Sequence, residues 1–249
     1  MEPVFRALEI TAKAVVKAVG SPISYQGLQN IPRCGGAVLA VNHTSYVDFL
    51  PAGLAVHYCG RRMRYLIKAE MQQVKSVNFL IKHTRTIPVN RASGADAYAV
   101  AVQRLRQGEV VGVYPEATIS RSFELKEFKT GAARMALEAQ VPIVPLIVWG
   151  AQRIWTKDHP RNLRRNKIPV TVAAGPPLSP HDDLEQLETE LRDQMTALLY
   201  RVQDEYPHPA GAYWVPRRLG GSAPTPVEAE VLERAEREER SHKHAGRDV

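Results

Sequence analysis

A histidine and an aspartate lie in the chain at a spacing suited to acid–base catalysis. Residues 42–48 read Asn-His-Thr-Ser-Tyr-Val-Asp and follow directly on the apolar run 37–41. A histidine oriented by a nearby carboxylate can act as a general base in acyl transfer. His43 and Asp48 are five residues apart, about 140° on a regular helix, so they do not share one helical face. We therefore expect His43 in a loop and Asp48 in the first turn of the helix that follows.

Two more groups of polar residues follow predicted strands. Arg91 ends the first group, and residues 114–122 form the second, with Glu116, Thr118 and Arg121 among them. The carboxyl ends of strands in α/β folds meet at a crevice where ligands bind. Guanidinium groups bind phosphate through paired hydrogen bonds. Each residue alone would be an ordinary surface charge or ion-pair partner, but their common position at strand ends favours a phosphate site beside the histidine.

Short apolar runs alternate with helical patterns along the middle of the chain. The order predicts an α/β fold with a central sheet covered by helices. The strand-like runs are 37–41, 64–67, 87–89, 110–114, 143–148 and 170–173, and the helical patterns are 46–58, 96–106, 130–140 and 184–202.

Both ends of the chain differ from this middle part, which we take as a catalytic domain over 23–215. Residues 1–22 form an amphipathic helix with apolar side chains on one face and basic side chains on the other. Such a helix lies in a membrane interface or packs on the domain, and the pattern does not choose between them. Residues 216–249 are charged and polar, so we expect an exposed, partly disordered tail.

The formal charge of +7 is unevenly distributed. From Pro224 onward seven acidic and five basic residues give a net −2, so the preceding residues carry about +9. A basic body suits nucleic acid, an anionic membrane or phosphate-bearing substrates. No aromatic RNA platform or DNA-binding motif is present, and no apolar run of about 18 residues predicts a spanning helix. Neither of the two cysteines lies in a C-x-x-C pair, which argues against a zinc or redox motif.

In their order and spacing, these groups resemble the blocks of the glycerophospholipid acyltransferase family, the 1-acyl-sn-glycerol-3-phosphate acyltransferase-like proteins. Residues 42–48 resemble the family's N-H-x-x-x-x-D block, and 87–91 resemble its second block. Residues 114–121 resemble P-E-G-T-R-S-R, and 141–145 resemble the fourth block, an apolar strand with two prolines. Lys68 stands where the family has a lysine between the first two blocks.

The resemblance implies a central mixed sheet covered by helices and an enzyme that transfers a fatty acyl group. The donor would be acyl-coenzyme A or acyl-carrier protein, and the acceptor 1-acylglycerol 3-phosphate or a related lysophospholipid. His43 would be the general base and Asp48 its orienting partner, with no metal or cofactor. We expect a peripheral enzyme on the cytoplasmic face of an anionic membrane, with no nucleic-acid partner. The residues expected to contact substrate are Asn42, Lys68, Arg91, Glu116, Thr118 and Arg121.

Two departures from the family pattern keep other acceptors open. Ala117 replaces the family's glycine and Ile119 its first arginine, which removes one possible phosphate contact. The acceptor could instead be a glycolipid or a lysolipid without a terminal phosphate. A thioesterase, with water as acceptor, is a weaker alternative, and a basic nucleic-acid or membrane-binding module is the non-enzyme alternative.

Overall fold

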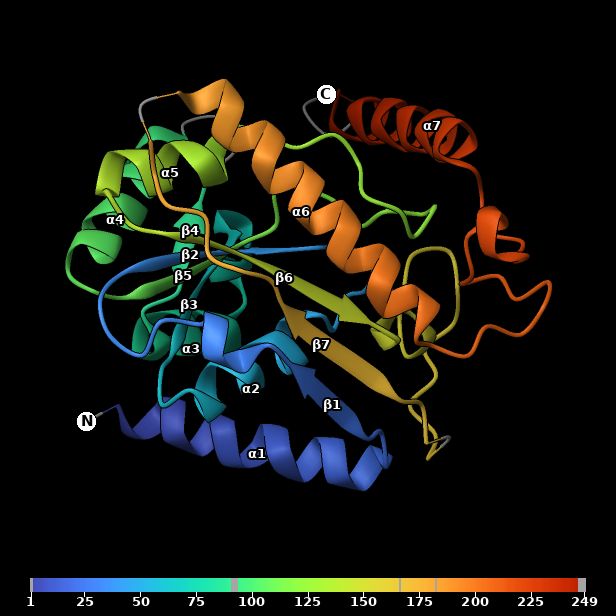
Figure 1. The fold of residues 1–249 in the computed structure, drawn as a ribbon, viewed down its shortest axis with the longest axis horizontal. Coiled ribbons are helices and arrows are strands. Elements are labelled where there is room, and N and C mark those ends of the chain that lie inside the picture. The colour runs from blue at the N-terminus through green and yellow to red at the C-terminus, as the bar shows by residue number, and fades with distance from the viewer. Residues whose placement is uncertain (1, 91–93, 166, 182, 246–249) are drawn as a thin grey trace.

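A seven-stranded sheet occupies the centre of the molecule (Figure 1). The computed structural model describes residues 2–90, 94–165, 167–181 and 183–245. The strands lie in the order β1-β7-β6-β2-β5-β3-β4. β7 pairs antiparallel with β6, whereas the other neighbouring pairs are parallel, so the sheet is mixed. The strands are β1 (Ile23–Gln26), β2 (Ala37–Val41), β3 (Met63–Lys68), β4 (Ile87–Val89), β5 (Val110–Val113), β6 (Ile143–Trp149) and β7 (Val170–Ala174).

The two central strands β2 and β6 are apolar along their length because both of their faces are covered. Every residue of β2 and β6 is buried. Val38 of β2 lies in register with Val111 of β5 on one side and with Ile143 of β6 on the other. Strands buried on both faces read as continuous aliphatic runs, and these two do.

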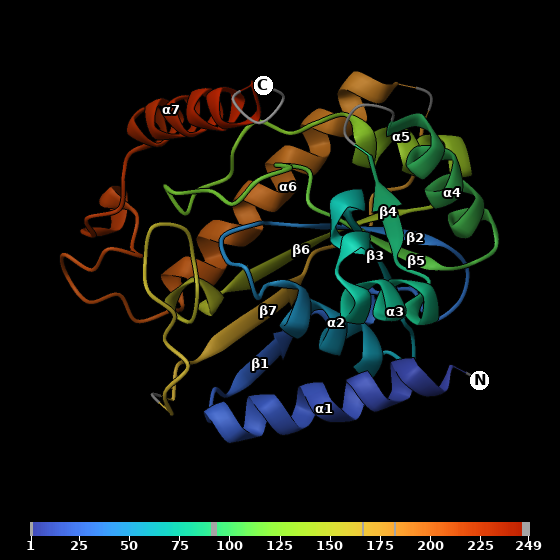
Figure 2. The ribbon, with the colours of Figure 1, turned by 180° about the vertical axis from the view of Figure 1, so that it is seen from behind.

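Helices cover both faces of the sheet (Figure 2). On one face, α2 (Phe49–Tyr58) packs on an apolar cluster that includes Leu39 and Val41 of β2. On the other face, α4 (Gly94–Arg106), α5 (Gly131–Ala139) and α6 (Leu184–Asp204) close a second cluster. The sequence prediction of a central mixed sheet covered by helices is confirmed.

The first helix, α1 (Pro3–Val19), lies against α2 and α3 (Lys75–Thr84). Its apolar face turns toward the domain, where the ring of Phe5 lies 5.2 Å from the guanidinium of Arg62 and 5.7 Å from that of Arg64. Its opposite face is exposed and includes Arg6 and Lys17. The helix therefore packs on the domain through part of the apolar stripe seen in the sequence, but none of its residues is fully buried and Val15 is 46% exposed. Among the described residues, no helix combines the length and apolar character needed to cross a bilayer.

The structure adds elements that the sequence pattern did not reveal. β1 and α3 were not predicted, and the helix expected over 46–58 begins only at Phe49. Within the segment expected to be a partly disordered tail, the structure has a helix, α7 (Pro226–Ala245). Short 3-10 turns occupy Leu28–Asn30, Ala69–Gln73, Ala151–Arg153 and Arg217–Leu219.

Candidate active site

The loop that leaves β2 brings His43 and Asp48 together. His43 stands in the loop, and Asp48 occupies the N-cap position of α2. The imidazole Nδ1 lies 3.2 Å from Asp48 Oδ2. The same oxygen accepts hydrogen bonds from the backbone amides of Thr44 at 2.8 Å and Ser45 at 2.7 Å. The loop thus folds around a single carboxylate oxygen, which is the geometry that the spacing required.

Burial differs sharply between the two partners. Asp48 is fully buried, whereas 20% of the His43 side chain is exposed. Complete burial raises the pKa of Asp48, and the hydrogen bonds from His43, Ser45 and Thr44 oppose that rise. With Nδ1 donating to the carboxylate, Nε2 is the basic nitrogen of the ring. The ring also stacks on Tyr114, with centroids 4.1 Å apart, so its orientation is fixed on two sides.

Glu116 ties this loop to the segment that follows β5. One of its carboxyl oxygens accepts the amide hydrogen of His43 at 2.8 Å, and the other accepts that of Lys126 at 3.1 Å. The amide of Ser120 in turn donates to the carbonyl of His43 at 2.8 Å. Burial raises the pKa of Glu116 to about 8, against the opposing hydrogen bonds from the two amides. Glu116 therefore braces the loop of residues 42–48, which differs from its expected role as a substrate contact.

Asn42 also differs from the expectation. Its side chain is fully buried and bonds to the backbone of Val148 in β6, donating to the carbonyl at 3.1 Å and accepting from the amide at 2.6 Å. These bonds extend the attachment of β2 to β6 past the end of the strand, so Asn42 anchors the start of the loop that carries His43. A buried side chain bound to β6 in this way does not reach a substrate.

The remaining residues expected to contact the substrate do not form one cluster among the described residues. Arg121 is nearly buried and pairs with Asp158 at 2.6 Å and with Glu236 at 2.9 Å. Thr118 accepts a hydrogen bond from the ammonium of Lys126 at 2.5 Å. Lys68 lies exposed at the end of β3, and Arg91 falls outside the described residues.

The two departures from the family pattern have clear structural settings. Ala117 adopts a φ of 58°, the left-handed conformation that glycine adopts without steric cost. Ile119 is buried, so this position contributes an aliphatic group to the interior where the family has a guanidinium.

Comparison with known proteins decides the family. The family model described as Acyltransferase matches residues 22–149, slightly more than half of the chain, and spans the histidine loop and the segment after β5. The chain belongs to the acyltransferase family.

Three curated relatives of this acyltransferase are named as 1-acyl-sn-glycerol-3-phosphate acyltransferases. The 1-acyl-sn-glycerol-3-phosphate acyltransferase of Bacillus subtilis is 27% identical over 140 residues, which cover 56% of this chain and 68% of that protein. The protein of that name from Borreliella burgdorferi is 27% identical over 56% of each chain. The alpha form from Mus musculus is 26% identical over 75% of this chain and 66% of its own. The matches thus leave about a third or more of each of these relatives uncovered.

A solved structure shares the fold of this acyltransferase. The crystal structure of the 1-acyl-sn-glycerophosphate acyltransferase PlsC from Thermotoga maritima superposes with a TM-score of 0.68 at 20% identity, over 82% of both chains. At this identity the likeness concerns the fold.

Sequence reasoning missed two cations near the site of the acyltransferase. Lys126 and Lys157 lie in the segments after β5 and β6, and both pair with carboxylates of α7. In the sequence each lysine lies outside the four recognised blocks, and nothing distinguishes it from an ordinary surface lysine. Only the tertiary structure reveals that Lys157 shares the partner Glu236 with Arg121, and that Lys126 pairs with Glu233, about one turn earlier on the same helix.

Proposed function

We propose that this acyltransferase moves a fatty acyl group from acyl-coenzyme A or acyl-carrier protein to a hydroxyl of 1-acylglycerol 3-phosphate or a related lysophospholipid. The hydrogen bond between His43 and the buried Asp48 is the observation that carries the proposal. It leaves a partly exposed imidazole with Nε2 as its base, at the carboxyl end of a central strand where α/β folds bind substrates.

In the proposed mechanism, His43 Nε2 takes the proton of the acceptor hydroxyl as its oxygen attacks the thioester carbonyl. The C–O bond forms and the C–S bond breaks, and the imidazolium returns the proton to the departing thiolate. Asp48 holds the imidazole in the required tautomer and stabilises the imidazolium. The acceptor itself is the nucleophile, so the reaction needs no acyl-enzyme.

The acceptor assignment draws on the relatives and on charge. The relatives are named for 1-acyl-sn-glycerol 3-phosphate, and Arg121, Lys126 and Lys157 supply cations that suit its phosphate. The buried Ile119 favours a second candidate, a lysolipid without a terminal phosphate, because it removes one guanidinium from the segment. A panel of lysophospholipid and monoacylglycerol acceptors with one acyl-coenzyme A, read by mass spectrometry, separates the two. A repeat with acyl-carrier protein identifies the donor.

The mechanism is tested by replacing the proposed base. His43→Ala should lower kcat by about 10²- to 10⁴-fold, the usual contribution of a positioned general base, while the melting temperature changes little. His181→Ala is the matched control, because His181 also pairs with a carboxylate, that of Glu190 at 3.4 Å, and is partly exposed. A His43→Ala enzyme with the kcat of the control would refute the role of His43.

We further propose that the enzyme reaches its lipid acceptor as a peripheral protein at the anionic cytoplasmic face of a membrane. The positive charge of the body and the exposed basic face of α1 support this proposal.

A further inference from the structure

The C-terminal helix α7 lies against the segments that follow β5 and β6, on the upper edge of the molecule in Figure 1. Glu233 of α7 pairs with Lys126 at 2.5 Å. Glu236, about one turn further along, pairs with Arg121 at 2.9 Å and with Lys157 at 3.0 Å. Two carboxylates of one helix therefore occupy three cations that belong to the acyltransferase body.

Two of these cations adjoin the catalytic loop, residues 42–48, which carries the proposed base. Arg121 directly follows Ser120, whose amide donates to the carbonyl of His43 at 2.8 Å. Lys157 directly follows Thr156, whose hydroxyl donates to the carbonyl of Thr44 at 2.7 Å. Both cations are thus one residue away from a group that binds the backbone of the catalytic loop.

The cations form a partly desolvated group rather than a solvated surface patch. The side chains of Arg121, Lys157 and Lys126 are 9%, 12% and 22% exposed. Arg121 Nη1 is buried and has no hydrogen-bond partner among the described residues. A buried guanidinium nitrogen without a partner is costly, and an anion with several acceptor oxygens would satisfy it.

We propose that Glu233 and Glu236 of α7 are internal competitors of the acceptor. They occupy Arg121, Lys126 and Lys157, the cations to which the proposed function assigns the acceptor phosphate, until the acceptor displaces them. The proposal deepens the proposed function and rests on it. The charges match. Apart from the carboxylates of α7, the described residues pair these three cations with one acidic side chain, that of Asp158. Without α7, the three cations and Asp158 therefore carry a net charge of +2. A phosphomonoester carries about −1.5 to −2 at neutral pH.

The way α7 is attached suits a displaceable element. Ala229 is its one buried side chain over residues 226–239, while Val227 and Val231 are 73% and 62% exposed. The helix is thus held mainly by its ion pairs, and a phosphate replaces the hydrogen bonds that the departing carboxylates give up. The first turn remains intact on displacement, because Thr225 and Glu228 form a reciprocal capping box at 2.9 and 3.2 Å.

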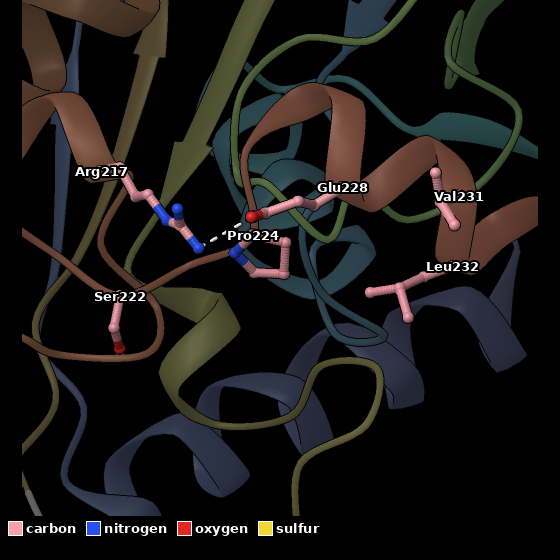
Figure 3. Close-up of a pocket in the computed structure, with 6 residues that line it drawn as sticks. All are labelled: Arg217, Ser222, Pro224, Glu228, Val231 and Leu232. Carbon is pink, nitrogen blue, oxygen red and sulfur yellow. Dashed lines mark ion pairs between the residues drawn. The ribbon is translucent and has the colours of Figure 1, made fainter.

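The start of α7 also has its own attachment, separate from the cationic site. Figure 3 shows a pocket between this turn and the preceding segment, lined by residues that include Ser222, Pro224 and Leu232. Arg217 and Glu228 form an ion pair of 2.9 Å across it. The helix can therefore move about its first turn while Glu233 and Glu236, further along, leave the cations.

The test measures phosphate binding without catalysis. Inorganic phosphate is titrated calorimetrically into the full chain and into Glu233→Gln/Glu236→Gln. The double variant should bind phosphate about tenfold more tightly. If α7 covers the cations in about 90% of the molecules, only about a tenth can bind phosphate, and the apparent affinity is lowered by about that factor. Saturating phosphate should also speed amide hydrogen exchange of residues 226–239 in the unaltered protein. Adding Lys157→Gln to the double variant should weaken its phosphate binding.

The matched control is Glu230→Gln/Glu238→Gln, which makes the same charge change on exposed positions of the same helix. Equal phosphate affinity in the unaltered protein and Glu233→Gln/Glu236→Gln would overturn the competition, as would a gain equalled by the control. So would phosphate binding that leaves exchange in α7 unchanged. Acyl transfer is assayed separately. If phosphate releases α7 but the chain transfers no acyl group, only the proposed function is refuted. If the chain transfers acyl groups normally and phosphate does not release α7, only this inference is refuted.

Discussion

At the scale of single residues, one carboxylate oxygen of Asp48 accepts three hydrogen bonds, one from the His43 ring and two from backbone amides. In Asp48→Asn, one orientation of the amide puts a nitrogen donor where the carboxylate oxygen now accepts. The other orientation keeps an oxygen acceptor there, but it has no negative charge to stabilise the imidazolium. By comparison with oriented histidines in acyl transfer, we expect kcat to fall by about 10³- to 10⁴-fold. The acceptor KM should change little. Steady-state kinetics alongside a melting curve measure both, and a variant that keeps a tenth of kcat contradicts the orienting role.

Glu116 makes stability depend on pH. Its pKa is about 8 in the fold, against 4.5 for an ordinary glutamate. Between these values the folded chain holds a proton that the unfolded chain has released. The contribution of this group to stability is therefore fully present below pH 4.5 and is lost as the pH rises toward 8. The limiting slope is about 1.4 kcal/mol per pH unit.

Glu116→Gln should remove this contribution, because glutamine does not titrate. The variant loses one acceptor and is less stable at about pH 5.5, but its free energy of unfolding should vary less with pH than that of the unaltered protein. Urea unfolding of both proteins from about pH 5.5 to 8 provides the comparison. Parallel curves would show that Glu116 does not hold its proton in the fold.

The sequence located the proposed base and its partner but not the groups that brace them. His43 and Asp48 are close in the chain, so their contact depends on local geometry alone. Asn42 and Glu116 find partners at Val148 and Lys126, and these partners are backbone groups on other segments. A backbone amide has no signature in the sequence, so the pattern suggested substrate contacts for side chains that serve the loop.

At the scale of elements, the buried strands were the most predictable. The run 37–41 was predicted with its observed bounds, because both faces of β2 are covered and every position is apolar. β1 escaped notice as a four-residue edge strand whose positions are exposed or only partly buried. α3 escaped because only Ile81 and Thr84 of its ten residues are buried, so its apolar face is narrow. In the sequence, Glu233 and Glu236 of α7 read as part of a solvated tail because their cationic partners outside the helix lie at least 79 residues away in the chain.

Helix α1 offers a prediction about membrane binding. Its apolar face packs on the domain, so its exposed Arg6 and Lys17 are groups left to meet anionic lipid. Arg6→Gln/Lys17→Gln should weaken binding to phosphatidylserine vesicles by up to about 2 kcal/mol, near 1 kcal/mol per cation. Flotation measures it, with Lys129→Gln/Arg201→Gln as a control of equal charge at exposed positions outside α1. Equal loss in both variants would remove α1 from the membrane contact.

For this test of membrane binding, point substitutions in α1 are easier to interpret than deletion of residues 1–20. Deletion would also remove Glu2, which pairs with Arg64 at 2.8 Å and with Arg62 at 3.4 Å. Arg62 would also lose its pair with Glu9, whereas Arg64 would keep its pair with Glu109. The changed charge of this surface would alter vesicle binding for that reason alone.

At the scale of the whole molecule, the sheet separates two apolar cores. The core beneath α4, α5 and α6 lies on the face away from α2, the helix that Asp48 starts. Leu191 of α6 is buried in that core. Leu191→Ala should lower the free energy of unfolding by about 2–5 kcal/mol, as is usual for a buried leucine, and leave kcat within about twofold. Urea unfolding and kinetics at low temperature test this, with the exposed Thr189→Ala as control. A large loss of kcat in the folded variant would show that the far core supports the site.

The brace made by Glu116 and Ser120 has a consequence for how acceptor choice can change. The segment that carries Arg121 is bonded at two points to the backbone of His43, so the two move as one body. A substitution that reshapes this segment for a new headgroup will also tilt the imidazole. The segment before Lys157 is bonded to the same loop at Thr44, Ser45 and Tyr46, so it is coupled to the imidazole as well. A new headgroup preference on either side should therefore keep its rate only when second substitutions restore the position of the loop.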